Sequence, residues 1–275
     1  GGMVRDIALV DMNKDMADGE ALDLRHGAAM TASQTFTSGS DYGVVDGSDC
    51  VVITAGLRRK PDESRLELIN RNVGLFRQIL DSLKGAKLND GATLLVVSNP
   101  VDILTQLAAE SGIVPASQVV GLGTVLDTCR FRSLLADHFQ VGARDVHALI
   151  LGEHGDSMVP IWSSATVNGV SIKSLPGYTE DAARGVFDFT KKSGAEVIRL
   201  KGGAGRAVGV SIGEVVHAMA LDSGAILPVS SMQSGKAGIS GVCLSLPTRV
   251  VRKGVGEILE PVVNEEEAAG LQKSA

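Results

Sequence analysis

Aromatic residues and cysteines are both scarce in this chain, and each scarcity excludes a class of protein. Phe, Trp and Tyr make up only 3% of the 275 residues, whereas 44% are hydrophobic, so any core must be built from aliphatic side chains. The three cysteines, Cys50, Cys129 and Cys243, form neither an even disulfide framework nor a metal-binding spacing, and no metal site is visible. We therefore expect buried thiols in a reducing compartment, the cytoplasm.

Long apolar runs and basic runs are also missing. No run approaches the roughly 20 apolar residues that cross a membrane, and no secretory signal is visible. The net charge of −6 without a basic run argues against nucleic acid or an anionic membrane as a partner. Recognition of a small anion must therefore rest on a few placed arginines. We expect the chain to begin within a fold, which leaves a targeting segment ahead of Gly1 open.

The first half of the chain alternates short apolar runs with helical patterns. A helix with apolar residues three and four positions apart follows Ser64, and Pro100 is placed to open another. This alternation predicts an α/β fold with a doubly wound parallel sheet, Rossmann-like, whose site lies at the carboxyl ends of the strands. The predicted strands span residues 6–11, 50–55, 93–97 and 119–122.

The pattern changes after a fifth apolar run at 146–151. A bent hairpin with Asn168-Gly169 as its turn is expected, followed by two long helices and a pair of antiparallel strands. We place a boundary near Gly123, between a dinucleotide-binding domain (1–123) and an α+β substrate domain (124–275). The predicted elements of the second domain are the hairpin 158–172, helices 179–200 and 208–223, strands 227–231 and 242–246, and a helix after Asn264.

One histidine stands in a setting suited to chemistry. His154 follows the apolar run at 146–151 in a glycine-flanked turn, Gly152-Glu153-His154-Gly155, where a small substrate can approach the ring. Asp127 and Arg130 lie three residues apart on a predicted helix and hence on one face. A histidine that moves a proton, an aspartate that orients it and an arginine that holds a carboxylate form a proton-transfer site. The alternative is a surface ion pair beside a buried histidine.

With these residues in hand, the chain resembles the lactate/malate dehydrogenase family over essentially its whole length. The resemblance rests on four motifs in the family's order and spacing: Thr54-Ala55-Gly56, Val97-Ser98-Asn99-Pro100-Val101-Asp102, Leu126-Asp127-x-x-Arg130-Phe131-Arg132 and Gly152 to Ser157. It implies hydride transfer between NAD and a small 2-hydroxy acid. Family members begin with a strand and a glycine-rich turn that should precede Asp6, so we expect the first domain to lack both and the chain to be a partial member.

The resemblance also implies roles for individual residues. His154 would exchange the hydroxyl proton, oriented by Asp127, and Arg65 would polarise the reacting carbonyl when its loop closes. Arg130 would bind the substrate carboxylate, and Asn99 would hydrogen-bond the substrate oxygen.

The expected cofactor contacts follow the strand ends. Asp11 would accept from the adenosine ribose hydroxyls, and an acid at this position favours NAD over NADP. The other cofactor residues that the resemblance implies are Thr54, Ala55, Gly56, Arg58, Val97 and Asn99.

The substrate is predicted from Arg59, six residues before Arg65. Lactate dehydrogenases resemble one another in having glutamine there and malate dehydrogenases in having arginine, and a second guanidinium in a dry pocket requires a second carboxylate. Ala204 and Leu122 agree with the malate type, so malate/oxaloacetate is the expected pair. The alternatives are an L-lactate dehydrogenase that tolerates Arg59, and an inactive fragment or non-enzymatic homologue.

Two further expectations concern assembly. Arg132 and His147 match positions that bind fructose 1,6-bisphosphate between subunits in some bacterial lactate dehydrogenases; a helix-surface arginine and a strand histidine are the alternative. The resemblance implies a homodimer or homotetramer.

Overall fold

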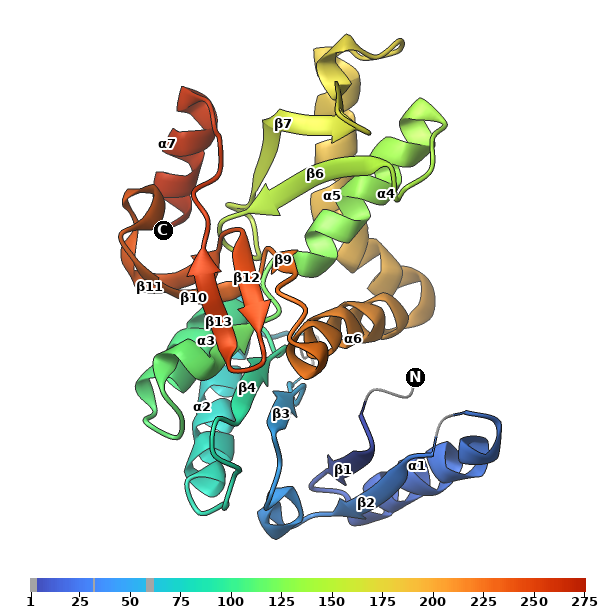
Figure 1. Cartoon of the computed structure of the whole chain (residues 1–275), viewed down its shortest axis with the longest axis vertical. Coiled ribbons are helices and arrows are strands. Elements are labelled where there is room, and N and C mark those ends of the chain that lie inside the picture. Colours follow the sequence, from blue (N-terminus) through green and yellow to red (C-terminus); the bar gives the residue numbers. More distant parts are fainter. Residues whose placement is uncertain (1–3, 32, 58–61) are drawn as a thin grey trace.

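A five-stranded sheet forms the centre of the molecule. The computed structural model describes residues 4–31, 33–57 and 62–275. The sheet has the order β11-β10-β5-β4-β3, and Figure 1 shows it between the two ends of the molecule. Its parallel part is β3 (Cys50–Ile53), β4 (Thr93–Val96) and β5 (Val119–Gly121), and its antiparallel part is β10 (Ser230–Ser234) and β11 (Ser240–Ser245).

Two helices cover the parallel strands because their apolar faces match an aliphatic sheet. All four residues of β4 are buried, as expected for a strand with a helix-covered face. Leu94 and Val96 of this strand pack in a cluster with α2 (Arg65–Leu83) and α3 (Val101–Glu110) through residues such as Phe76 and Leu104. Helix α2 begins as predicted at Ser64, which forms a capping box with Glu67.

The first strand lies in a separate sheet, unlike the single sheet that we expected. β1 (Asp6–Val10) pairs in parallel with β2 (Thr35–Gly39), and α1 (Lys14–Gly27), capped by Asn13, connects them. Figure 1 shows this unit at the foot of the molecule, and no ladder within the described ranges joins β1 to β3. Sequence analysis missed β2 because its sequence, Thr-Phe-Thr-Ser-Gly, contains one large apolar residue and gives little hydrophobic signal.

The second half of the chain builds an antiparallel sheet against two helices. β6 (Val146–Leu151) pairs with β7 (Val159–Val167), and β7 pairs with β8 (Val170–Ser171) through the predicted turn, where Asn168 and Gly169 both have positive φ. Phe131 of α4 (Val125–Phe139) is fully buried in this core, and α4 lies beside α5 (Glu180–Lys201) in Figure 1.

The remaining elements return the chain to the central sheet. A predicted strand over 227–231 is wrong in its bounds, because Pro228 cannot donate to a ladder and divides it into β9 and the start of β10. The short 3-10 turns are Ala28–Met30, Tyr42–Val45, Ala116–Gln118, Ile172–Ser174 and Lys236–Gly238. The other elements are β9 (Ile226–Leu227), β12 (Thr248–Val251), β13 (Gly254–Ile258), α6 (Arg206–Leu221) and α7 (Glu265–Ser274).

The segment between β5 and α4 joins the two halves, and it has no room for a side chain at its one glycine, Gly123. A Cβ at Gly123, where φ is +53°, would lie 2.3 Å from the Ser245 hydroxyl oxygen and 2.5 Å from the Ser230 amide nitrogen. Next to it, the Thr124 hydroxyl donates to the Ile150 carbonyl at 2.5 Å. β5, β6 and β10 are therefore held together at one point. No helix of the described residues is long and apolar enough to span a membrane.

We predict that Gly123→Ala destabilises the fold by about 3 kcal/mol or more, because a positive φ and a steric collision coincide there. Gly169→Ala is the matched control: φ is +85°, but no described atom lies within 4 Å of its Cβ. Its expected cost is about 1–2 kcal/mol from the backbone conformation alone. Denaturant unfolding of both variants measures the difference, and equal losses would contradict the collision at Gly123.

Candidate functional site

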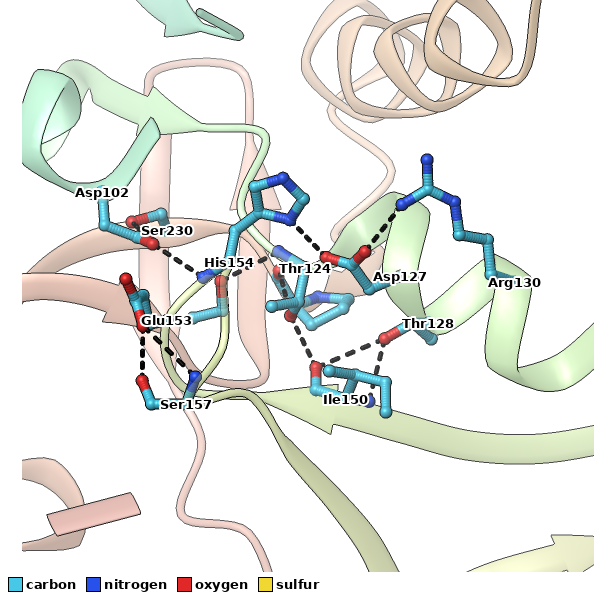
Figure 2. A network of polar contacts seen from close by, with 12 residues as sticks. Asp102, Thr124, Asp127, Thr128, Arg130, Ile150, Glu153, His154, Ser157 and Ser230 are labelled. Atoms are coloured by element: carbon cyan, nitrogen blue, oxygen red, sulfur yellow. Dashed lines mark hydrogen bonds and ion pairs between the residues drawn. The ribbon is translucent and has the colours of Figure 1, made fainter. Parts of the chain in front are cut away.

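Asp127 lies between the predicted histidine and arginine and bonds to both, as Figure 2 shows. One carboxylate oxygen is 2.5 Å from His154 Nδ1, and the other accepts from Arg130 Nη1 at 2.9 Å. The Asp127 side chain is 1% exposed. The structure therefore brings together the three residues that the sequence singled out, and the alternative of a surface ion pair is wrong.

The histidine reaches this position because β6 is docked on the start of α4. The Thr128 hydroxyl accepts from the Ile150 amide at 3.0 Å, while the Thr124 hydroxyl donates to the Ile150 carbonyl. Both threonines are buried. Since His154 lies four residues after Ile150, these bonds place its turn directly against the helix that carries Asp127.

A second buried carboxylate holds the histidine from the opposite side. Asp102, in the first turn of α3, accepts from the His154 amide at 2.7 Å and from the Ser230 hydroxyl at 2.6 Å. Burial raises the pKa of Asp102, although both hydrogen bonds favour its charged form. Asp102 lies at the end of the motif Val97 to Asp102, but the sequence alone predicted no role for it. The available signal was an acid inside the otherwise apolar start of a helix, Val101 to Leu104.

The electrostatics of the site favour a protonated histidine. Burial by itself would lower the pKa of His154. The hydrogen bond to Asp127 and the charges of Asp127 and Asp102 outweigh this effect, with Arg130 opposing them, and the net pKa is raised above its ordinary value. Protonated His154 therefore stabilises the fold below the unfolded-state pKa of about 6.5, and this stabilisation is lost as pH rises through the folded-state pKa.

Arg65, from the other half of the chain, reaches the same turn. Its guanidinium forms an ion pair with Asp156, two residues after His154. Both side chains are exposed, so the pair contributes little to stability. The ion pair shows that the N-terminus of α2 lies next to the turn that carries His154. The predicted role of Arg65 requires this proximity.

The other residues predicted to contact the substrate have no contact with His154, Asp127 or Arg130 among the hydrogen bonds and ion pairs of the described residues. Asn99 is exposed just after β4, and Ala204 is exposed just before α6, whereas Leu122 is buried at the end of β5. Arg58 and Arg59 lie outside the described residues.

The predicted cofactor residues follow the carboxyl ends of β1, β3 and β4. Asp11 is exposed, and its side chain accepts from the Asn13 amide at 2.8 Å. Thr54, Ala55, Gly56 and Asn99 are also exposed, and Val97 is half-buried.

Neighbouring side chains anchor the backbone that follows β3. The Ser98 hydroxyl donates to the Ala55 carbonyl at 2.6 Å, and Asn72 accepts from the Leu57 amide at 2.7 Å. An exposed carboxylate at the end of β1 and an exposed, anchored backbone after β3 suit the ribose and the extended body of a dinucleotide, so these residues fit NAD.

The predicted anion site is not assembled by a contact between its two residues. Arg132 Nη2 donates to the Ala143 carbonyl at 3.5 Å, while His147 is exposed on β6. Arg132 Nε is buried and has no hydrogen-bond partner among the described residues. Binding of a sugar bisphosphate at these positions stays a prediction.

Comparison with known proteins adds two family models and named relatives. Residues 1–121 match the lactate/malate dehydrogenase NAD binding domain, and residues 124–275 match the lactate/malate dehydrogenase alpha/beta C-terminal domain. L-lactate dehydrogenase 1 of Clostridium acetobutylicum is 42% identical over 283 residues, which cover 100% of this chain and 88% of that protein. L-lactate dehydrogenase B of Hordeum vulgare is 45% identical over 278 residues, 98% of this chain and 80% of that protein.

Solved structures agree with the sequence matches. The minor L-lactate dehydrogenase of Enterococcus mundtii, in a ligand-bound form, has a TM-score of 0.92 at 32% identity, with 99% of this chain and 95% of that chain covered. MGS-M5, a lactate dehydrogenase from a Medee basin deep-sea metagenome, has a TM-score of 0.93 at 32% identity, with 99% and 88% covered.

We predict that Asp127→Asn lowers the pKa of His154, because the amide removes the charge that favours the imidazolium. The measurement is an NMR titration of the His154 ring, assigned by its loss in His154→Gln. Asp137→Asn, an exposed acid on the same helix, is the control and should leave the titration unchanged. A His154 pKa that is the same in Asp127→Asn as in the parent would contradict the electrostatic account.

Proposed function

The chain belongs to the lactate/malate dehydrogenase family, and on that premise we propose that it interconverts pyruvate and L-lactate with NAD as its cofactor. The coarser activity, hydride transfer between NAD and a small 2-hydroxy acid, is the chemistry of this family. The observation that carries the proposal is the His154–Asp127–Arg130 constellation. Lactate is favoured over the malate that sequence analysis expected, because the relatives and solved structures above are named lactate dehydrogenases.

Arg130 binds the substrate carboxylate. Its Nη1 is held by Asp127, and the side chain is 19% exposed, so the guanidinium is oriented but still accessible. A guanidinium matches a carboxylate with two parallel hydrogen bonds, which fixes the substrate's orientation as well as its position. The bound substrate thereby presents its C2 oxygen to a defined point in the site.

His154 moves the proton that accompanies the hydride. Because Nδ1 faces Asp127, Nε2 is the atom left for the substrate oxygen. In reduction, the imidazolium donates its Nε2 proton to the C2 oxygen of the substrate, and in oxidation the neutral ring takes that proton back; bound NAD would supply or accept the accompanying hydride. The raised pKa of His154 favours the protonated form, which is the form that reduction requires.

Two further groups act on the reacting oxygen. Arg65 leaves Asp156 and turns its guanidinium to the carbonyl, where it stabilises the charge that develops on oxygen. Asn99 supplies a hydrogen bond from the end of β4. Asp102 does not contact the substrate. It accepts a hydrogen bond from the backbone of His154 and thereby fixes the orientation of the imidazole ring.

Malate/oxaloacetate is the second candidate, and Arg59 is the observation that favours it. A guanidinium at this loop position would pair with a distal carboxylate, and with pyruvate it would lose this partner. Ala204 and Leu122 agree with the malate type. An inactive fragment or non-enzymatic homologue is the third candidate. It would be distinguished from the two enzymes by a failure to bind NADH.

Domain boundary, assembly and location complete the proposal. A boundary between residues 123 and 124 agrees with the extents of the two family models. A homodimer or homotetramer is supported by exposed apolar residues on α5 and α6, such as Phe189 and Val210. Three unpaired cysteines support a cytoplasmic location.

We predict that the purified chain oxidises NADH with pyruvate at a kcat/KM at least about tenfold above that with oxaloacetate. The measurement is NADH absorbance with each acid at matched concentrations. The reverse preference would replace lactate by malate as the proposed substrate. Absence of turnover with both acids, together with absence of NADH binding, would favour the inactive fragment.

We predict that Arg59→Gln raises kcat/KM for pyruvate and lowers it for oxaloacetate, because glutamine leaves no unpaired charge in the closed pocket. Each change should be at least about tenfold, the scale of one charged hydrogen bond. Lys173→Gln, a cation of the second half far along the chain, serves as the control for loss of positive charge. Unchanged selectivity in Arg59→Gln would exclude this arginine from the pocket.

A further inference from the structure

One glycine of helix α5 lies directly against the arginine that binds the carboxylate. A Cβ at Gly194 would be 3.4 Å from Arg130 Nη2, 3.6 Å from Nη1 and 3.7 Å from Cζ. The guanidinium therefore lies at van der Waals distance from the point where a side chain of α5 would begin at this position. No other glycine of the described residues has Arg130 as a neighbour within 4 Å.

This glycine carries a cost that its helix does not require. Gly194 lies inside α5, where glycine is less favourable than alanine. Its φ is not positive, so the backbone conformation suits any residue. The feature that distinguishes the position is the guanidinium, which lies 3.4–3.7 Å from where a Cβ would stand.

We infer that Gly194 is a positioning residue for Arg130: the absence of a side chain at this position leaves the guanidinium room beside α5 while Asp127 holds its Nη1. This inference rests on the proposed function, because it gives Arg130 the substrate carboxylate as its ligand.

Two contacts define the orientation of the guanidinium. Asp127 fixes one nitrogen at 2.9 Å, which leaves rotation about that hydrogen bond open. The neighbouring helix α5 restricts this rotation, because position 194 lies beside the planar guanidinium. A side chain longer than alanine at position 194 would extend into the space of the guanidinium and turn it, and the two hydrogen bonds to a carboxylate require a defined plane.

The test compares Gly194→Val and Gly194→Ala with the same substitutions at Gly185. Gly185 lies nine residues earlier on α5, hence on the opposite face, and no described atom lies within 4 Å of its Cβ. Both positions undergo the same change in helix propensity. Only position 194 places methyl groups on Arg130.

We expect Gly194→Val to raise KM for the preferred 2-oxo acid by about tenfold with kcat nearly unchanged, since Arg130 binds the carboxylate equally before and during reaction. Gly194→Ala should give a smaller rise, because its Cβ just fits. Both Gly185 variants should keep the parent KM. NADH affinity should be unchanged in all four variants, and thermal unfolding verifies that each is folded.

Three outcomes distinguish this inference from the proposed function. An active parent with equal KM in the Gly194 and Gly185 variants overturns the role of Gly194 alone. A fall in kcat at constant KM in Gly194→Val also overturns it, because loss of folded protein acts in that way. A parent that neither turns over a 2-oxo acid nor binds oxamate in the presence of NADH overturns the proposed function and, with it, the role of Gly194.

Discussion

The buried carboxylate of Asp127 is the interaction on which the site depends. It accepts from Arg130 on its own helix and from His154 on a distant turn, so a single side chain sets the geometry of two functional groups. A buried charge is stable only with such partners. The partners in turn gain what their chemistry needs: the histidine has a raised pKa, and the guanidinium has a defined orientation.

That arrangement requires the two halves of the chain to meet at a fixed distance. Gly123 and Thr124 bring β5, β6 and β10 into contact, and Asp102 connects the first half to the backbone of His154. The ion pair between Arg65 and Asp156 also connects the two halves, at the solvent-exposed surface. The proposed proton-transfer group, His154, thus belongs to one half of the chain, while Asp102 and Arg65, which contact its turn, come from the other. Movement between the halves would alter these contacts.

The sequence predicted those parts of the structure whose signal is local. The helix start at Ser64, the turn at Asn168-Gly169 and the placement of Asp127 and Arg130 on one face of α4 depend on neighbouring residues only, and all three are confirmed. Predictions failed where a local signal was weak or interrupted. β2 has a single large apolar residue, and Pro228 divides what had been predicted as one strand. His154 stands out in the sequence because it follows an apolar run in a glycine-flanked turn, and the family resemblance then implies a role for it.

By itself, then, the sequence determined the class of fold, the family and the three residues at the centre of the site, because these follow from periodicity and from motifs. Only the tertiary structure decided which groups surround that centre. Asp102 lies 52 residues before His154 along the chain, and Gly194 lies 64 residues after Arg130. Such contacts form only when helices and strands pack together, so the spacing of residues along the sequence does not predict them. The electrostatic setting of the histidine is therefore a property of the fold.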